Sequence, residues 1–329
     1  MSSSPPGTNP PAAPTRAGAP TRAAGVRISY AELPGSVHRW VERELGSRVV
    51  SASTQSGGFS PGAAARLVTA SGRRGFVKAV GSELNPDSPG LLRRERAAME
   101  VMPALPWTPR MRSAYDDGDW IALLFDDVEG REPAHPWTAD DTDLVFGALG
   151  DLTAALTPTP WPAAPDLSDA GLFRGGWARL LDSLPADLDP WIVAHLDQLR
   201  EYQQRARAAV VGETLVHWDI RADNVLVTES GVVFVDWAWA ARGARWVDTA
   251  LAALDLVISG SRVDVDDLLS RHPCTRDTDP LDVTALHASV AGALTERSRA
   301  PAPPGLPTIR DYQRVVADAL TAWIRRRMS

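Results

Sequence analysis

Apolar residues in the first part of the chain follow two different periods. Between residues 48 and 130 they form short runs with a period of two, separated by turns rich in glycine and proline, which is typical of strands. Four strands are expected, of which the first three are antiparallel: residues 48–53, 63–71, 75–80 and 120–130. Two segments have apolar residues at helical spacing instead: residues 34–46 and 91–105.

Helical spacing dominates after residue 130. Three long helices are expected: residues 138–156, 190–210 and 308–327. Thr138 and Asp141 stand at the spacing of a capping box where the first of them begins. The pattern therefore predicts an α+β protein with an antiparallel sheet in an N-terminal lobe, residues 26–127, and a mainly helical C-terminal lobe, residues 128–329.

The first 25 residues differ from the rest of the chain. They are mainly Pro, Ala, Ser, Thr and Gly, and the motif APTR occurs at 13–16 and at 19–22. Because this composition offers no apolar face to bury, we predict a disordered tail at residues 1–25. The whole chain has 329 residues and 44% hydrophobic content, enough for a large core.

Charge and cysteine content limit the classes of partner. The net charge of −7 gives no general attraction to nucleic acid or to anionic lipid. The single cysteine, Cys274, excludes an intramolecular disulfide and a CxxC metal or redox site, as is usual in a reducing cytoplasm. Neither a membrane helix nor a signal peptide is recognisable. We expect a cytoplasmic protein without nucleic-acid or membrane partners.

One short segment, LVHWDIRADNVLV at residues 215–227, concentrates polar side chains between apolar ends. Its polar centre is a solvated turn, a buried polar network or a reaction site. The next apolar strand, in GVVFVDWAWA, ends in Asp236. If the two strands pair as a hairpin, Asp219, Asn224 and Asp236 converge. Their oxygens suit Mg²⁺, which prefers oxygen ligands together with phosphates and water, and Asp219 then faces a substrate hydroxyl.

The basic residues are unusually uniform, because every one is arginine except Lys78 in the strand segment RGFVKAV. A compact ammonium group is not interchangeable with a guanidinium fork. Taken alone, the single lysine is explained by function or by chance about equally well.

These segments, in this order, resemble the aminoglycoside phosphotransferase family, whose members share the two-lobed protein-kinase-like fold. The resemblance extends over about residues 35–325. HWDIRADN is similar to the catalytic loop of the family, which implies that Asp219 accepts the proton of the substrate hydroxyl and that Asn224 binds Mg²⁺. Asp236, in FVDW, is similar to the second metal ligand.

The resemblance also implies a site for ATP or GTP as the phosphate donor. Lys78 matches the strand lysine that contacts the α- and β-phosphates, and Glu95 matches the helix glutamate that pairs with it. His217 and Asp248 match residues that support the catalytic loop. Arg221 is a candidate second cation for the γ-phosphate.

Two loops are further candidates for nucleotide contacts. The turn GGFSPG, residues 57–62, stands where it would cover the phosphates, and Gly58 and Ser60 are its candidate phosphate-binding residues; a plain hairpin turn is the alternative. The segment FDDVEG is similar to the hinge of the family, which makes the Asp126 carbonyl and the Val128 amide candidates for base contacts.

The sequence departs from the family pattern at Trp218 and Ala222, and neither change removes a catalytic group. The DFG and APE signatures of protein kinases are absent, which argues against a protein substrate. We expect a small-molecule kinase that phosphorylates a hydroxyl of an antibiotic, of aminoglycoside or nucleoside type, and so confers resistance. The alternatives are a kinase of a primary metabolite, such as an amino alcohol or ketoamine, and a non-catalytic nucleotide-binding regulator.

Two groups of residues bear on the acceptor. The first is an acidic segment that would suit a polycationic aminoglycoside or would simply begin a helix: Asp264, Asp266 and Asp267. The second is a set of aromatic residues that would stack on a sugar or base, or would belong to the core: Trp237, Trp239 and Trp246.

Overall fold

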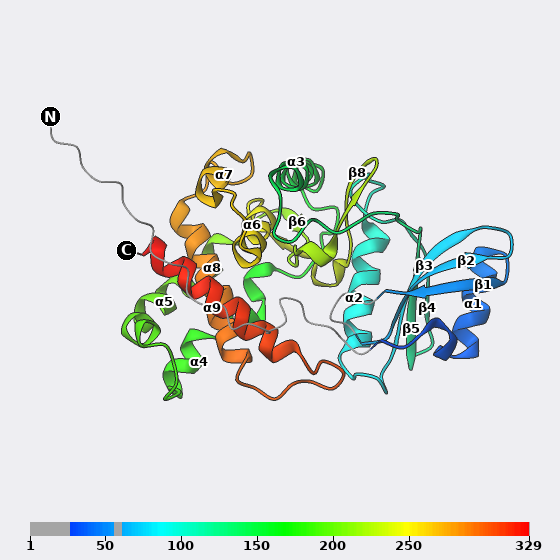
Figure 1. Cartoon of the computed structure of the whole chain (residues 1–329), viewed down its shortest axis with the longest axis horizontal. Helices are drawn as coiled ribbons and strands as arrows, with labels where there is room; N and C mark the ends of the chain where they lie inside the picture. The colour runs from blue at the N-terminus through cyan, green and yellow to red at the C-terminus, as the bar shows by residue number, and fades with distance from the viewer. Residues whose placement is uncertain (1–26, 56–60, 329) are drawn as a thin grey trace.

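The computed structural model describes residues 27–55 and 61–328, which form two lobes (Figure 1). The predicted tail at residues 1–25, and Gly58 and Ser60 of the glycine-rich turn, lie outside these residues. The N-terminal lobe contains an antiparallel sheet of order β1-β2-β3-β5-β4. Its strands are β1 (Val49–Thr54), β2 (Ala63–Thr69), β3 (Arg74–Gly81), β4 (Met111–Asp116) and β5 (Trp120–Phe125).

One helix covers each face of this sheet. The short turn η1 (Tyr30–Glu32) leads into α1 (Gly35–Leu45), whose apolar stripe packs on Val77 and Ala79 of β3. The opposite face packs against α2 (Ser88–Val101). Because side chains alternate across a strand, Lys78 lies on the α2 face.

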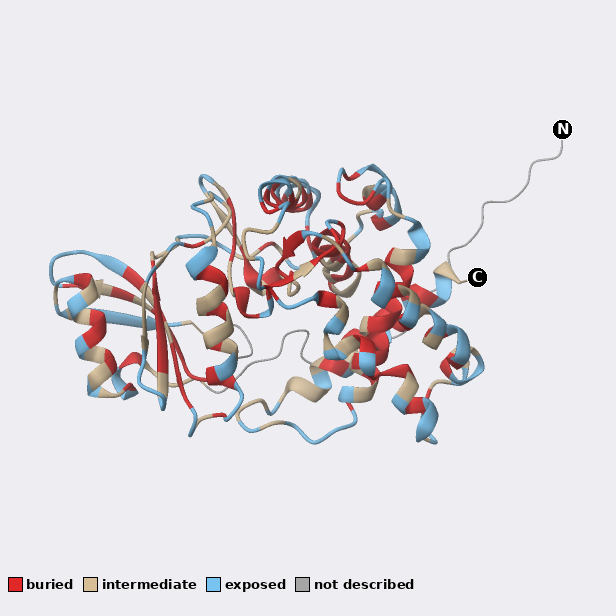
Figure 2. Cartoon of the chain, turned by 180° about the vertical axis from the view of Figure 1, so that it is seen from behind, coloured by how far each residue is buried: buried red, intermediate tan, exposed pale blue. Residues whose placement is uncertain are grey.

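The C-terminal lobe is mainly helical (Figure 2), with buried residues on the inner faces of its helices. The helices are α3 (Ala139–Ala155), α4 (Trp177–Asp182), α5 (Pro190–Ala209), α6 (Val247–Ser259), α7 (Val265–Arg271), α8 (Pro280–Arg297) and α9 (Ile309–Arg327). Two short antiparallel ladders pair β6 (Thr214–Val216) with β9 (Ala241–Gly243), and β7 (Val225–Thr228) with β8 (Gly231–Phe234). The remaining elements are single turns: η2 (Leu167–Asp169), η3 (Gly171–Arg174), η4 (Ala222–Asn224) and η5 (Trp237–Trp239).

The segment between α8 and α9 reaches across to the N-terminal lobe (Figure 1). There the Asn85 amide donates a hydrogen bond of 3.0 Å to the Pro304 carbonyl. The side-chain oxygen of Asn85 accepts from the backbone N–H groups of Asp87 and Ser88, at 2.9 and 3.0 Å, where α2 begins. One asparagine therefore holds both the start of α2 and a contact between the lobes.

Most predicted elements are confirmed, including the antiparallel sheet and the helical second lobe. The helix predicted at residues 34–46 is α1, and it ends at Gly46 with a left-handed φ of 66°. Thr138 caps α3 by accepting from the Asp141 N–H. Helices α5 and α9 match their predicted segments. No helix within the described ranges is long and apolar enough to cross a membrane.

Several predicted boundaries are wrong, and one strand was not predicted. The helix expected at residues 91–105 begins earlier, at Ser88, where Asn85 binds the first N–H groups, and it ends at Val101 before Pro103. The strand expected at residues 120–130 ends at Phe125, and β8 ends at Phe234, two residues before the predicted end at Asp236. Strand β4 was not predicted, because its half-exposed edge position leaves no apolar alternation in the sequence.

A buried histidine joins three helices in the core of the C-terminal lobe. His287 of α8 donates from Nε2 to the Ala250 carbonyl of α6 at 3.0 Å. Its Nδ1 accepts from the Trp323 indole N–H of α9 at 3.3 Å. Burial lowers the pKa of His287 to about 3, and the charge of Arg327 acts in the same direction.

We predict that His287→Gln makes the protein less sensitive to acid. The histidine is neutral in the folded state but binds a proton when unfolded below its ordinary pKa of 6.5, so its contribution to stability falls as the pH drops below that value. Glutamine can donate and accept in the same place without titrating. From about pH 8 to about pH 5 the wild type should lose about 2 kcal/mol more unfolding free energy than the variant. Denaturant titrations at both pH values measure this difference, and parallel losses would contradict it.

Candidate active site

The polar segment of residues 217–224 is a loop between β6 and β7, and a buried carboxylate of α6 holds its first turn. The N–H of His217 donates to Asp248 at 2.7 Å, and the N–H of Trp218 donates to the other carboxylate oxygen at 2.9 Å. Trp218 adopts a left-handed φ of 66°, which an L-residue holds only with support from its surroundings. Burial raises the pKa of Asp248 to about 6, against the effect of these two hydrogen bonds.

His217 links the loop to the end of β8. Its Nε2 donates to the Val235 carbonyl at 2.8 Å, and its Nδ1 accepts from the Asp219 N–H at 3.3 Å. Burial lowers the pKa of His217 to about 4, so the ring is neutral. Both ring nitrogens are used in these bonds, which is the geometry that a supporting role requires.

Asp219 lies at the centre of a group of charged and amide side chains. Nη1 of Arg221 donates to both of its carboxylate oxygens, at 2.8 and 3.0 Å, while Nε and Nη2 of Arg221 each donate to one oxygen of Asp223, at 2.9 and 2.8 Å. The Asn224 amide donates to the Asp219 carboxylate at 3.0 Å and to its backbone carbonyl at 2.9 Å. Burial raises the pKa of Asp219 to about 7, although Arg221 acts against this shift.

The hairpin of β7 and β8 brings Asp236 to the same place, as the sequence predicted. Val225 pairs with Phe234, and the Val235 N–H donates to the Asn224 carbonyl at 2.9 Å. Asp236 follows directly in a left-handed conformation, with φ at 70° and ψ at 66°. This strained conformation lies two residues beyond the end of β8, at the residue that was expected to bind metal.

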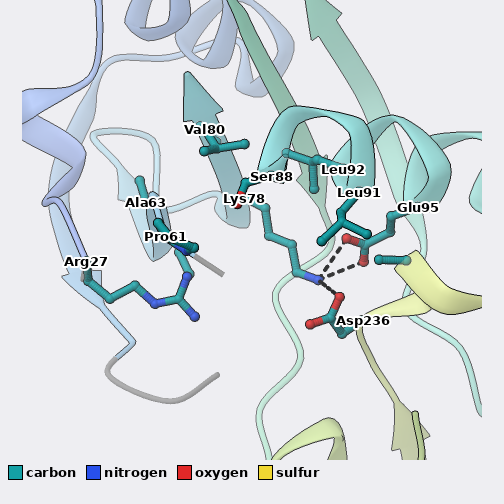
Figure 3. A pocket seen from close by; sticks show the side chains of 13 residues that line it. Arg27, Pro61, Ala63, Lys78, Val80, Ser88, Leu91, Leu92, Glu95 and Asp236 are labelled. Atoms are coloured by element: carbon teal, nitrogen blue, oxygen red, sulfur yellow. Dashed lines mark hydrogen bonds and ion pairs between the residues drawn. The ribbon is translucent and has the colours of Figure 1, made fainter. Parts of the chain in front are cut away.

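Lys78 joins the two lobes at this point (Figure 3). Its Nζ lies 2.7 and 2.9 Å from the carboxylate oxygens of Glu95 and 3.2 Å from Oδ1 of Asp236. Burial by itself lowers the pKa of Lys78, but the charges of Asp236 and Glu95 outweigh it and hold the pKa above its usual value. The predicted pairing of Lys78 with Glu95 is therefore present, and Asp236 completes an ion triad.

The donor atoms around this triad fit a hard divalent cation. The Asn224 NH₂ group faces Asp219, so its oxygen remains for a ligand, and Lys78 engages one oxygen of Asp236. Within residues 27–55 and 61–328, no cluster of three or more His, Cys, Asp or Glu side chains could hold a metal by itself. A cation here would take most of its ligands from phosphate and water, as Mg²⁺ usually does.

The predicted base contacts lie away from the triad. Asp126 and Val128 follow β5, and neither lines the cavity around Lys78 as far as the described residues form it. The Asp126 N–H donates to the Arg110 carbonyl at 2.9 Å. The neighbouring Asp127 is buried in ion pairs with arginines of β2 and β3. Base binding at this segment stays a prediction.

The acidic segment begins a helix. Asp264 caps α7 by accepting from the Asp267 N–H at 3.0 Å, and Asp266 and Asp267 pair with Arg327 and Arg271. Asp266 and Asp267 are thus paired with arginines, and Asp264 serves as the helix cap.

The aromatic residues mostly belong to the core. Trp237 and Trp246 are buried, but 41% of Trp239 is exposed. The Arg94 guanidinium lies over the Trp239 ring, 5.1 Å from its centre.

Asp255 is a site residue that sequence reasoning missed. Its carboxylate accepts from the Ala222 N–H in the catalytic loop at 3.0 Å and from the Trp137 indole at 2.9 Å. It lies two turns after Asp248 on α6, and these are the only charged residues of that helix. Two carboxylates seven residues apart in an otherwise apolar helix would have been the signal.

Comparisons with known proteins identify the family and the fold. Residues 65–282 match the family model described as the phosphotransferase enzyme family. No curated protein sequence matches the chain.

Solved structures align over most of the chain at low identity. Choline kinase LicA from Streptococcus pneumoniae has 15% identity and a TM-score of 0.52, covering 88% of this chain and 100% of its own. A choline/ethanolamine kinase family protein from Mesorhizobium loti has 14% identity and a TM-score of 0.54, covering 85% and 88%. An aminoglycoside phosphotransferase from Streptomyces rimosus has 19% identity and a TM-score of 0.45, covering 86% and 95%. The expected protein-kinase-like fold is confirmed.

We predict that Asp248→Asn destabilises the protein by about 1.5 to 3 kcal/mol, because asparagine offers one acceptor oxygen to two buried N–H donors. Asp248→Ala removes both acceptors and should cost more. Thermal or denaturant unfolding measures these differences. Asp143→Asn, at an exposed position of α3, is the matched control and should change stability by less than about 0.5 kcal/mol. Equal stability of Asp248→Asn and the control would contradict the prediction.

Proposed function

The chain belongs to the phosphotransferase enzyme family, and we propose that it transfers the γ-phosphate of ATP or GTP to a hydroxyl group of an antibiotic. The family match runs from β2, before Lys78, to the start of α8. Membership of this family makes the protein a small-molecule kinase. The antibiotic acceptor, of aminoglycoside or nucleoside type, and the resulting resistance are the proposed part.

The observation that carries this proposal is the ion triad beside the catalytic loop. Phosphoryl transfer requires little covalent chemistry from the protein, and mainly needs positioning and neutralisation of negative charge. Lys78 supplies a fixed cation, while the loop supplies a carboxylate, Asp219, held by Arg221 and Asn224. The 3.2 Å contact between Lys78 and Asp236 places this cation beside the loop, because the residue before Asp236 is hydrogen-bonded to Asn224.

In the proposed reaction, Asp219 orients the acceptor hydroxyl through one carboxylate oxygen and takes its proton. Asn224 holds the Asp219 carboxylate in one orientation, because its amide donates to both the carboxylate and the backbone carbonyl of Asp219. Lys78 contacts the α- and β-phosphates, and Glu95 keeps its ammonium in place. Arg221 offers a further positive charge toward the γ-phosphate.

Asn224 and Asp236 would hold Mg²⁺. The metal, when bound, would supply positive charge that neutralises the phosphate oxygens. In this proposal, residues 26–127 form the nucleotide-binding lobe and residues 128–329 carry the catalytic loop and the acceptor site.

We predict that Asp219→Asn lowers turnover by about 10² to 10⁴ and leaves nucleotide binding nearly unchanged. The measurement is mass spectrometry of a mixed panel of acceptor compounds that is incubated with the protein, Mg²⁺ and either ATP or GTP. The panel contains aminoglycosides, nucleoside antibiotics, choline and ethanolamine, and the variant is the control. A gain of one phosphate on an antibiotic, absent with the variant, supports the proposal and identifies both acceptor and donor.

Other outcomes of the same measurement contradict parts of the proposal. Phosphate on choline or ethanolamine alone would make the protein a metabolite kinase. Nucleotide binding without transfer to any compound would favour a binding regulator. Unchanged turnover by Asp219→Asn would remove this residue from its catalytic role.

We also predict that Lys78→Arg lowers turnover by at least about tenfold, because the larger planar guanidinium cannot replace a compact ammonium between two carboxylates. Arg43→Lys, on the exposed surface of α1, is the matched control for a swap between the two cations. Initial rates on the acceptor found above, and nucleotide titrations of both variants, measure the effect. Wild-type rates for Lys78→Arg would refute the assigned role of the only lysine.

A further inference from the structure

A second cation lines the cavity that contains Lys78. Arg27 precedes η1, and its side chain extends toward the cavity that Lys78, Glu95 and Asp236 also line (Figure 3). It lies far from Lys78 in the sequence and in no recognisable motif, so the sequence alone did not identify it. Burial lowers the pKa of Arg27, and the charge of Asp236 partly offsets this effect.

Backbone contacts hold Arg27 in this position. Arg27 forms a parallel bridge with Gly62, and the Ile28 N–H donates to the Gly62 carbonyl at 3.2 Å. Gly62 has a φ of +122°, and a Cβ there would come within 2.5 Å of the Ala79 carbonyl of β3. Because only glycine permits this close approach, Gly62 connects the segment with Arg27 to β3, the strand of the active-site lysine.

Two carboxylates and two cations line this cavity. Two carboxylates, Glu95 and Asp236, share the ammonium of Lys78. Arg27 lies within the electrostatic reach of Asp236 and adds a guanidinium to the same cavity. A guanidinium presents several N–H donors in a plane and binds phosphate through two parallel hydrogen bonds. An ammonium and a guanidinium together suit a polyphosphate better than either cation alone would.

We propose that Arg27 binds the β- or γ-phosphate of the nucleotide and is a residue of the donor site. This inference rests on the proposed function. It assigns a phosphate-binding residue to the segment before α1, outside residues 65–282, which match the family model.

The test is isothermal titration of ATP and GTP, and of adenosine and guanosine, into the full-length protein with Mg²⁺. Arg27→Ala should weaken binding of the preferred triphosphate by about 10- to 100-fold and change binding of its nucleoside by less than about twofold. Arg27→Lys should recover part of this loss, because it keeps the charge without the fork. Arg43→Ala, on the exposed surface of α1, is the matched control and should bind like the wild type.

The outcomes separate this inference from the proposed function. Wild-type triphosphate affinity in Arg27→Ala would overturn the role of Arg27 and leave the kinase proposal intact. Equal losses for triphosphate and nucleoside would also overturn it, because they would indicate a structural role. A wild-type protein that binds neither triphosphate would overturn both.

Discussion

The position of one ammonium group determines how the two lobes meet. Lys78 comes from the sheet, Glu95 from the helix that covers it, and Asp236 from the hairpin of the other lobe. Without the lysine, the buried carboxylate of Glu95 and the partly exposed carboxylate of Asp236 would face each other, and breaking a fully buried ion pair in this way typically costs about 3 to 5 kcal/mol. The same constraint sets Asp236 next to the loop that holds Asp219 and Asn224, because that loop and the hairpin share the contact between Val235 and Asn224. The charge balance around Lys78 therefore contributes to the placement of the lobes, together with the contact between Asn85 and Pro304, and to the geometry of the site.

The loop of residues 217–224 has little regular structure of its own and takes its form from α6. Asp248 binds the N–H groups where the loop begins, and Asp255, two helical turns later, binds the N–H of Ala222 in its second half. Asp248 is buried and Asp255 is partly buried, which is costly for charged groups unless N–H donors satisfy them. The loop supplies those donors, so the helix and the loop each satisfy polar groups that the other would leave unpaired. A rigid scaffold of this kind suits a site that must position a substrate oxygen.

How much the sequence predicts depends on how locally each feature is encoded. The strands around Lys78 and the long helices follow from side-chain periodicity, and the cluster of Asp219, Arg221 and Asn224 lies within one short segment. The start of α2 could not be predicted, because it depends on the Asn85 side chain folding back on the helix. Arg27 and Asp255 escaped notice for a related reason, since each reaches the site only through contacts distant in sequence. The acidic segment of α7 was ambiguous because capping and ligand binding favour the same residues.

Lys78 is also the only side-chain amine of the protein. Amine-directed acylating reagents therefore have one side-chain target in the chain, and it lies at the point where the lobes join. A protonated ammonium is not nucleophilic, and the two carboxylates that raise the pKa of Lys78 keep it protonated while the triad is intact. Acylation of Lys78 therefore requires the ammonium to leave both Asp236 of the other lobe and Glu95 of its own lobe, so its rate reports how often the whole triad opens. Lys78 is thus a chemical probe of the triad that needs no engineered label.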